Sequence, residues 1–307
     1  MNILEHHVAL GGWPSPVEFV PELRNELWVK NDGLCHPVYG GNKVRKLEYL
    51  LADAGERIVT FGAMGSHHAL ATAVHGTAHG HQVVVVNHPR HHTPHAESVL
   101  RATLKLAEVH RFSSHEEALI ALHELGEGST VIPAGGSTPV GALGFVRAGL
   151  ELGDQVAAGL LPAPRRIFVA AGSAGTLAGL AVGVKMAGLD TRVVGVRVVP
   201  HEWMSREFIQ SLCDQTAELL GVSSGPWSLE DQWLGDGYAA TTPEADDALA
   251  SALPCGLDLE TCYTAKALAA ALAADGEGPD LYWQTHNQSP LDGLLDSAPT
   301  IDPSEWP

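Results

Sequence analysis

Short apolar segments alternate with helical patterns along this 307-residue chain, and this alternation restricts its fold more than any other feature. The strand-like segments are residues 57–61, 82–86, 131–133, 167–171, 192–199 and 281–283. Helices are expected at about residues 69–79, 176–186 and 265–274. Buried strands that alternate with helices are typical of a parallel sheet made of βαβ units. We therefore predict an α/β protein with one large domain or two smaller ones.

Lys43 is one of six lysines in the chain, and it follows Gly40, Gly41 and Asn42 at the start of a helical pattern. A lysine amine can form an imine with an aldehyde when burial or a neighbouring cation lowers its pKa. Lys43 is therefore a candidate for covalent catalysis. The structural alternative is a surface lysine on an amphipathic helix.

A loop of small residues at 172–176, with the sequence Gly-Ser-Ala-Gly-Thr, follows the strand-like segment 167–171 and opens the next helix. Small residues let the backbone approach an anion, which the free N–H groups and the helix dipole then bind. The loop matches neither a Walker A sequence nor Gly-x-Gly-x-x-Gly, so a nucleotide or sugar enzyme on a Rossmann-like sheet is disfavoured. It suits a single terminal phosphate, and a tight strand-to-helix turn is the alternative.

An imine-forming lysine together with a single-phosphate loop suggests pyridoxal 5'-phosphate (PLP). The whole chain resembles the PLP-dependent family that contains D-cysteine desulfhydrase and 1-aminocyclopropane-1-carboxylate deaminase. Four segments carry the resemblance, in the family's order along the chain: residues 40–48, 133–144, 172–176 and 263–266. The first looks like the family's Schiff-base motif, and the last is similar to its Tyr-Thr-Gly-Lys element.

This resemblance implies the tryptophan synthase β-like fold, fold type II. We expect two α/β lobes with open, mostly parallel sheets, helices on both faces, and PLP in the cleft between the lobes. The smaller lobe would be residues 46–150, and the larger, PLP-binding lobe would combine residues 1–45 with 151–307. The family is commonly dimeric, so a homodimer is expected.

The resemblance also assigns roles to individual residues. Lys43 carries PLP as a Schiff base and moves protons at the substrate Cα, and Ser66 and Tyr263 join it as catalytic residues. The other residues that hold the cofactor are Asn42, His67, Gly172, Ser173, Ala174, Gly175, Thr176 and Thr285. The substrate-binding residues are Ser66, His67, His68, Tyr238 and Tyr263.

Three segments depart from the family pattern. Residues 66–68 read Ser-His-His where the family has Ser-Asn-His or Ser-Asn-Gln, residues 284–287 read Gln-Thr-His-Asn in place of His-Thr-Gly-Gly, and residues 260–262 replace Asp-Pro-Val by Glu-Thr-Cys. Pocket positions such as His67, His286 and Asn287 therefore differ while the cofactor-holding positions remain. We expect an unusual substrate or a weakened family reaction.

The implied activity is that of a PLP-dependent lyase or deaminase acting on a small amino acid. The main hypothesis is α,β-elimination like that of D-cysteine desulfhydrase, which yields a keto acid and ammonia. The alternatives are ring opening of 1-aminocyclopropane-1-carboxylate with help from Tyr263, and an altered pocket that takes another amino acid. A PLP-binding relic with a regulatory role is the non-enzymatic alternative, and the presence of Lys43 opposes it.

Acidic residues outnumber basic ones 36 to 18, so the net charge of −18 disfavours nucleic-acid or anionic-membrane partners. A substrate carboxylate would then need a local positive site, which the helix that follows Ser66 could supply through its N–H groups. The four cysteines include no Cys-x-x-Cys pair, which is typical of reduced thiols. With no signal peptide and no apolar stretch of about 20 residues, we expect a soluble cytoplasmic protein.

Histidines are concentrated in two places, at residues 67–68 and in the segment 87–95, which contains His88, His91, His92 and His95. Clustered imidazoles can bind zinc, nickel or copper. However, the cluster has no cysteine ligands and lies in a segment that reads as a loop rich in histidine and proline. We expect a solvated loop or part of a lid there, and no metal site.

Overall fold

Ten strands form two sheets in the computed structural model, which describes residues 2–276, 278–302 and 306. The larger sheet has the order β1 (Val17–Phe19), β2 (Leu27–Asn31), β10 (Asp280–Gln284), β7 (Arg166–Ala171), β8 (Arg192–Arg197), β9 (Trp227–Glu230). The smaller sheet has the order β5 (Glu108–Arg111), β4 (Gln82–His88), β3 (Arg57–Ala63), β6 (Thr130–Ile132). Neighbouring strands are parallel except β1 and β2. The predicted α/β fold with mostly parallel sheets is therefore confirmed.

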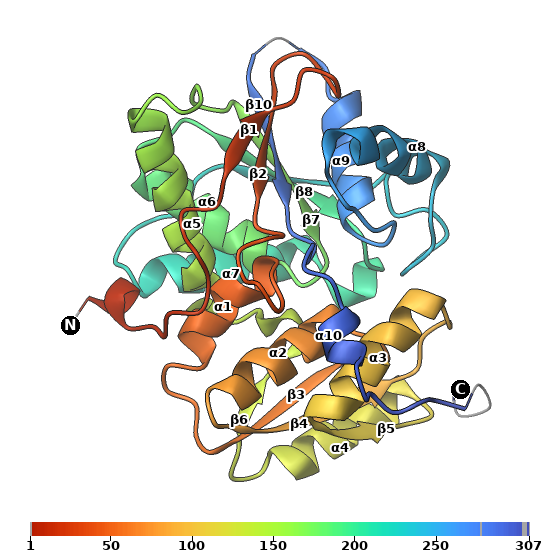
Figure 1. Cartoon of the computed structure of the whole chain (residues 1–307). Coiled ribbons are helices and arrows are strands. Elements are labelled where there is room, and N and C mark those ends of the chain that lie inside the picture. The colour runs from red at the N-terminus through yellow and green to blue at the C-terminus, as the bar shows by residue number, and fades with distance from the viewer. Residues whose placement is uncertain (1, 277, 303–305, 307) are drawn as a thin grey trace.

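Helices cover both faces of each sheet (Figure 1). On the smaller sheet, Ile58 packs with α2 (His67–Ala78), while its neighbour Val59 packs with α4 (His115–Gly126) on the opposite face. On the larger sheet, Val169 of β7 packs toward α5 (Pro139–Ala157) and α6 (Gly175–Met186), and Phe168 packs toward α8 (Pro243–Ala252) and α9 (Thr264–Ala273). Burial on both faces explains why these strands read as continuous apolar runs rather than alternating ones.

The remaining helices are α1 (Asn42–Leu50), α3 (Pro94–Leu106), α7 (Arg206–Glu218) and α10 (Asp292–Leu295). The short α10 packs on α3, so the end of the described chain crosses from the larger sheet to the smaller one (Figure 1). The predicted lobe boundary at residue 150 falls inside α5, which packs against α1 and α6. The division into lobes at that residue stays a prediction. Among the described residues, no helix is long and apolar enough to span a membrane.

The segment 87–95, predicted to be a loop, is a loop at residues 89–93, whereas its two ends belong to β4 and α3. β4 continues through His88, because Asn87 and His88 pair with Gly62 and Ala63 of β3. α3 begins at Pro94, and the Thr93 hydroxyl caps it by accepting a hydrogen bond from the Ala96 N–H at 3.1 Å. A threonine before a proline is a helix start signal, and it outweighed the loop-like composition.

A buried network of charges anchors α1. Arg45 donates to both carboxylate oxygens of Asp32, at 2.8 and 2.9 Å, and to Glu151 of α5 at 3.0 Å. Lys30 of β2 donates to the same Glu151 at 2.6 Å. Burial alone would raise the pKa of Glu151, but the charges and hydrogen bonds of Arg45 and Lys30 lower it to about 2. The network joins β2, α1 and α5, and it fixes the first turn of α1, where Lys43 lies.

Candidate active site

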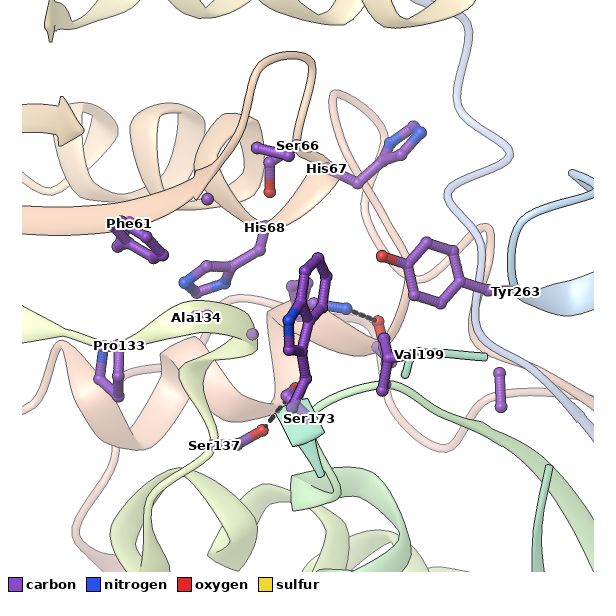
Figure 2. A pocket seen from close by; sticks show the side chains of 18 of the residues that line it. Phe61, Ser66, His67, His68, Pro133, Ala134, Ser137, Ser173, Val199 and Tyr263 are labelled. Carbon is purple, nitrogen blue, oxygen red and sulfur yellow. Dashed lines mark hydrogen bonds between the residues drawn. The ribbon is translucent and has the colours of Figure 1, made fainter. Parts of the chain in front are cut away.

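A cavity of about 630 Å³ lies where several strands of the two sheets end. The residues that follow β3, β6, β7 and β10 line it, together with the first turns of α1 and α2 (Figure 2). Ligand sites in α/β proteins form at the carboxyl ends of parallel strands, because the loops there are free of the sheet. This cavity is therefore the candidate active site, and it collects the loops in which the sequence motifs lie.

Lys43 lies in the first turn of α1, behind two glycines that the backbone requires. Gly41 has a φ of +88°, and a Cβ on it would come within 2.8 Å of the Thr285 carbonyl oxygen. A Cβ on Gly40 would come within 2.3 Å of the Gly33 carbonyl oxygen. The Gly-Gly sequence thus lets the start of α1 touch the segment after β10. Lys43 Nζ donates to Asn42 Oδ1 at 2.7 Å and lines the cavity.

Burial lowers the pKa of the Lys43 amine from 10.5 to about 8, although the Glu260 carboxylate opposes this shift. At that pKa about one tenth of the amine is neutral at pH 7, against a negligible share for an ordinary lysine. The neutral amine is the form that attacks a carbonyl carbon. The environment of Lys43 therefore suits imine formation.

The loop 172–176 has the geometry expected of a phosphate site. Ala174 adopts the left-handed conformation, with φ of +64°, and has no side chain that could cap α6, so N–H groups beyond Gly175 in the first turn can bind an anion. The Ser137 hydroxyl donates to Ser173 Oγ at 2.8 Å (Figure 2) and accepts from the Gly175 N–H at 3.2 Å. The Asn42 amide donates to Thr176 Oγ1 at 3.1 Å, which links the loop to the lysine segment.

Lys46, which the sequence analysis did not select, also reaches this loop. Its side chain is 2% exposed, and its Nζ donates to the Gly135 carbonyl oxygen at 3.0 Å and to Ser137 Oγ at 3.2 Å. Burial, and then the nearby charge of Lys43, hold the pKa of Lys46 well below its ordinary value. Burial therefore disfavours the charged form of Lys46, and an anion bound beside its Nζ would favour that form again. Lys46 lies three residues after Lys43, on the same face of α1, and this spacing is the sequence pattern that could have identified it as a site residue.

These residues fit the phosphate of PLP. A terminal phosphate needs several hydrogen-bond donors and a cation at close range, and hydroxyls, backbone N–H groups and Lys46 supply them. A Cβ on Gly135 would lie 2.0 Å from Ser173 Oγ, and one on Gly175 would lie 2.9 Å from Lys46 Nζ. The glycines thus keep the cradle open to a ligand and allow the donors to converge.

Two tyrosines meet at the cavity wall. The hydroxyls of Tyr238 and Tyr263 lie 2.7 Å apart, and a Cβ on Gly172 would lie 3.1 Å from the Tyr263 ring. Burial raises the pKa of Tyr238 to about 12 and raises that of Tyr263 well above its ordinary value. Both are therefore neutral phenols that can donate a hydrogen bond. Glu260 also lines the cavity, although it was not predicted to be a site residue. Its carboxylate accepts hydrogen bonds from the N–H groups of Tyr263 and Thr264 at the start of α9.

The segment 66–68 starts α2 at the cavity. Ser66 Oγ accepts from the Ala69 N–H at 3.3 Å and so caps the helix. The His68 ring points into the cavity (Figure 2), and its Nε2 lies 3.1 Å from Thr60 Oγ1. The His67 ring lies on the far side of the cavity from Ser173 (Figure 2), with Nδ1 bonded to the Tyr39 hydroxyl and Nε2 bonded to His95. Contact between His67 and the cofactor stays a prediction.

The segment after β10 closes one side of the cavity. Thr285 is buried and lines the cavity, and its carbonyl oxygen accepts from the Asn42 N–H at 3.0 Å. The Asn287 Oδ1 accepts from the Gly40 N–H at 2.6 Å. Asn287 therefore supports the lysine segment. The ring of His286 lies edge-on to that of His67, with their centroids 4.8 Å apart.

An aromatic wall, defined here as Phe61, His88, His115 and Trp203, extends the cavity beyond the motif residues. The His115 ring is nearly parallel to the Trp203 indole, with centroids 6.0 Å apart, and lies 5.4 Å from the Phe61 ring. This wall could not be predicted from the sequence, because its members come from β3, β4, α4 and the segment after β8. Only the three-dimensional arrangement brings them together.

The structure thus brings the predicted site residues to one cavity. Those that line it are Asn42, Lys43, Ser66, His67, His68, Gly172, Ser173, Ala174, Thr176, Tyr238, Tyr263 and Thr285. Gly175 belongs to the same loop and contacts Ser137. Of the histidines predicted to form a solvated loop, His88 lines the cavity and His95 contacts His67, whereas His91 and His92 are exposed. The individual roles of the site residues stay predictions.

Comparison with known proteins supports the same interpretation. The model of a family described as "Pyridoxal-phosphate dependent enzyme" matches residues 8–281. A D-cysteine desulfhydrase of Salmonella choleraesuis is 32% identical, over 91% of this chain and 95% of that protein. Nocardicin C-9' epimerase of Nocardia uniformis is 33% identical, over 84% and 85%. A solved structure described as an ACC deaminase homologue superposes with a TM-score of 0.80 at 29% identity, covering 96% of this chain and 98% of that one.

These matches confirm the predicted fold type II and the predicted cofactor, which the family model names. They also confirm the resemblance to the desulfhydrases and deaminases. The chain belongs to the family of pyridoxal-phosphate-dependent enzymes.

Proposed function

We propose that this PLP-dependent lyase removes the β-substituent of a small amino acid, in the manner of D-cysteine desulfhydrase, and releases a keto acid and ammonia. The observation that carries the proposal is the position of Lys43, whose pKa is lowered to about 8, in one cavity with a phosphate loop and two neutral tyrosines. The names of several relatives support the reaction class.

In this proposal Lys43 is the residue that would hold the cofactor, at its aldehyde group. The loop 172–176, Ser137 and Lys46 would hold the phosphate, and Thr285 would serve the pyridine end of the cofactor. When bound, PLP withdraws electrons from the substrate Cα and so acidifies its proton. A hydroxyl such as that of Thr285 does not keep a proton on the ring nitrogen as a carboxylate would, which moderates this withdrawal.

Lys43 then acts as the base at the substrate Cα. An amine with a pKa near 8 is close to the operating pH, which favours both loss and gain of a proton. The tyrosine pair can supply the proton that the leaving group needs. If Tyr238 donates to Tyr263, the proton of Tyr263 is free to pass to the departing sulfur, and the electron pair of the broken C–S bond stays with that sulfur.

The start of α2 can bind the substrate carboxylate. Ser66 Oγ occupies the Ala69 N–H, and the N–H groups of His67 and His68 have no acceptor within the helix because they belong to its first turn. These groups and the helix dipole favour an anion. They would provide the local positive site that a chain with a net charge of −18 requires.

A larger amino acid is the second candidate substrate, and the aromatic wall favours it. The rings of Phe61, His115 and Trp203 offer a surface on which an apolar or aromatic substrate side chain could pack. The altered-pocket alternative predicts exactly such a change of substrate. The same site residues could also open the ring of 1-aminocyclopropane-1-carboxylate, with Tyr263 as the proton donor.

The test is turnover by the PLP-loaded protein with D-cysteine, 1-aminocyclopropane-1-carboxylate and a series of D- and L-amino acids with aromatic side chains. Release of sulfide and pyruvate from D-cysteine, lost in Lys43→Ala and strongly slowed in Tyr263→Phe, would support the main proposal. Turnover confined to aromatic amino acids would replace it by the second candidate. Full activity in both Tyr263→Phe and Ser66→Ala would contradict the assigned roles, and chiral analysis of the recovered substrate would reveal an epimerase instead.

We further propose the division into a smaller lobe of residues 46–150 and a larger lobe of residues 1–45 and 151–307, and a cytoplasmic homodimer without nucleic-acid or membrane partners. The two separate sheets support the lobes, and the net charge of −18 supports the last point. Light scattering of the purified protein would test the dimer, and a monomeric mass would contradict it.

A further inference from the structure

Three histidines from distant parts of the chain meet at one edge of the cavity. His67 begins α2, His95 lies in the first turn of α3, and His286 follows β10. One ring nitrogen from each of the three lies within 4.8 Å of the other two. His67 Nε2 and His95 Nε2 are 2.9 Å apart, and the His286 ring lies edge-on to His67. We call these three residues the histidine trio.

We propose that the histidine trio binds a divalent transition-metal ion of the zinc class. Imidazole nitrogens bind Zn²⁺ at about 2.0–2.1 Å, so three of them around a tetrahedral ion are about 3.4 Å apart. Nitrogens that already lie within 4.8 Å need only small side-chain rotations to reach that spacing. The site differs from the one that the clustered histidines in the sequence suggested, because it uses only His95 from the segment 87–95.

Tyr39 supports the trio from behind. Its side chain is 1% exposed, and its hydroxyl is hydrogen-bonded to His67 Nδ1. With the Nδ1 hydrogen directed to Tyr39, the lone pair of His67 Nε2 faces His95. A hydrogen bond on the far nitrogen is the usual way in which proteins fix the tautomer and orientation of a metal-binding histidine. With both ring nitrogens engaged, His67 has none left to contact the cofactor. Metal binding would then explain why a histidine replaces the asparagine expected at this position.

The trio joins the two sides of the cavity. His67 and His95 belong to helices on the smaller sheet, whereas His286 belongs to the segment after β10 of the larger sheet. An ion bound there would tie these two parts together. Because His67 and His286 line the cavity, the ion would sit in its wall. Three protein ligands leave a fourth tetrahedral position, as in zinc sites that also bind water or a substrate group.

Without a metal ion, the contacts among the three histidines have another explanation. In that case one neutral imidazole of His67 and His95 donates to the other, and His286 only packs against them. The two explanations differ in a measurable way, because a hydrogen-bonded pair does not take up one equivalent of metal.

The experiment uses PLP-loaded protein without an affinity tag, freed of metal with a chelator and dialysed. Zn²⁺ is titrated by calorimetry, and Co²⁺ is titrated by its visible ligand-field absorption. We expect one equivalent per chain, with affinity at least tenfold weaker in His95→Ala and in His286→Ala. Tyr39→Phe should weaken metal binding about 10- to 100-fold, because it removes the hydrogen bond between the Tyr39 hydroxyl and His67 Nδ1. Zn²⁺ should raise the melting temperature of the wild type and not that of His286→Ala.

His92→Ala is the matched control, because His92 lies in the same histidine-rich segment, is exposed and pairs with Glu97 instead. It should bind metal like the wild type. Retention of the cofactor absorbance in each variant shows that the chain is folded. Absence of stoichiometric binding would overturn the proposal. So would unchanged affinity in His95→Ala and His286→Ala, or an equal loss in His92→Ala.

Discussion

Replacing Glu151 by alanine should destabilise the protein strongly, because this carboxylate neutralises two buried cations. It accepts hydrogen bonds from Lys30 at 2.6 Å and from Arg45 at 3.0 Å, and neither cation is more than 2% exposed. Breaking a buried ion pair from one side costs about 3–5 kcal/mol. The pKa of Glu151 gives a similar magnitude, because the difference between 4.5 and about 2 corresponds to about 3 kcal/mol in favour of the ionised form.

The assay is thermal and urea unfolding at pH 7, where Glu151 is ionised. For a chain of this length, about 2 °C per kcal/mol predicts that Glu151→Ala melts roughly 6–10 °C below the wild type. The matched control is Glu97→Ala, which breaks an exposed pair with His92 and should cost less than about 1 kcal/mol. Equal melting temperatures for the two variants would refute the reasoning. Because Arg45 lies on α1 two residues after Lys43, Glu151→Ala should also weaken PLP binding.

Lys46→Ala should weaken PLP binding about 10- to 100-fold, which is the loss expected for a charge-assisted hydrogen bond of about 1.5–3 kcal/mol. The control is Lys185→Ala, which removes an exposed lysine and should leave PLP binding unchanged. Equilibrium dialysis would compare the PLP affinities of the two variants. Stability should also fall in mild acid because of His75, whose pKa burial lowers from 6.5 to about 4. The unfolded chain binds a proton there below pH 6.5 while the folded chain does not until about pH 4, so about 3 kcal/mol is lost across that window. Urea titrations at pH 7 and 4.5 should show a smaller difference in His75→Gln than in the wild type, and an unchanged difference would contradict this origin.

The sequence predicted the α/β fold because the central strands are buried on both faces. Most residues of β3, β4 and β7 are buried beneath helices on one face or the other, so the apolar runs were easy to recognise. β2 was not recognised, because Lys30 and Asn31 interrupt its apolar pattern. Lys30 is nevertheless fully buried, since Glu151 and Gln155 accept its hydrogen bonds. Such a strand cannot be identified before its partners are known.

The candidate site was predictable where chemistry is concentrated in continuous segments. The lysine segment and the phosphate loop each keep a local sequence pattern, because glycine is needed at Gly41 and small residues at 172–176. Glu260 and the aromatic wall have no such pattern, because their elements are distant in the sequence. The histidine trio illustrates the limit, since His95 and His286 are separated by most of the chain and meet only in the folded protein.

Lys43, rather than its neighbour Lys46, should carry the cofactor. The direct measurement is reduction of the PLP-loaded protein with borohydride, followed by proteolysis and mass spectrometry of the labelled peptide. We predict a single phosphopyridoxyl group on Lys43, and no labelled peptide in Lys43→Ala. A label on Lys46, or an unlabelled protein that nevertheless turns over an amino acid, would contradict the account.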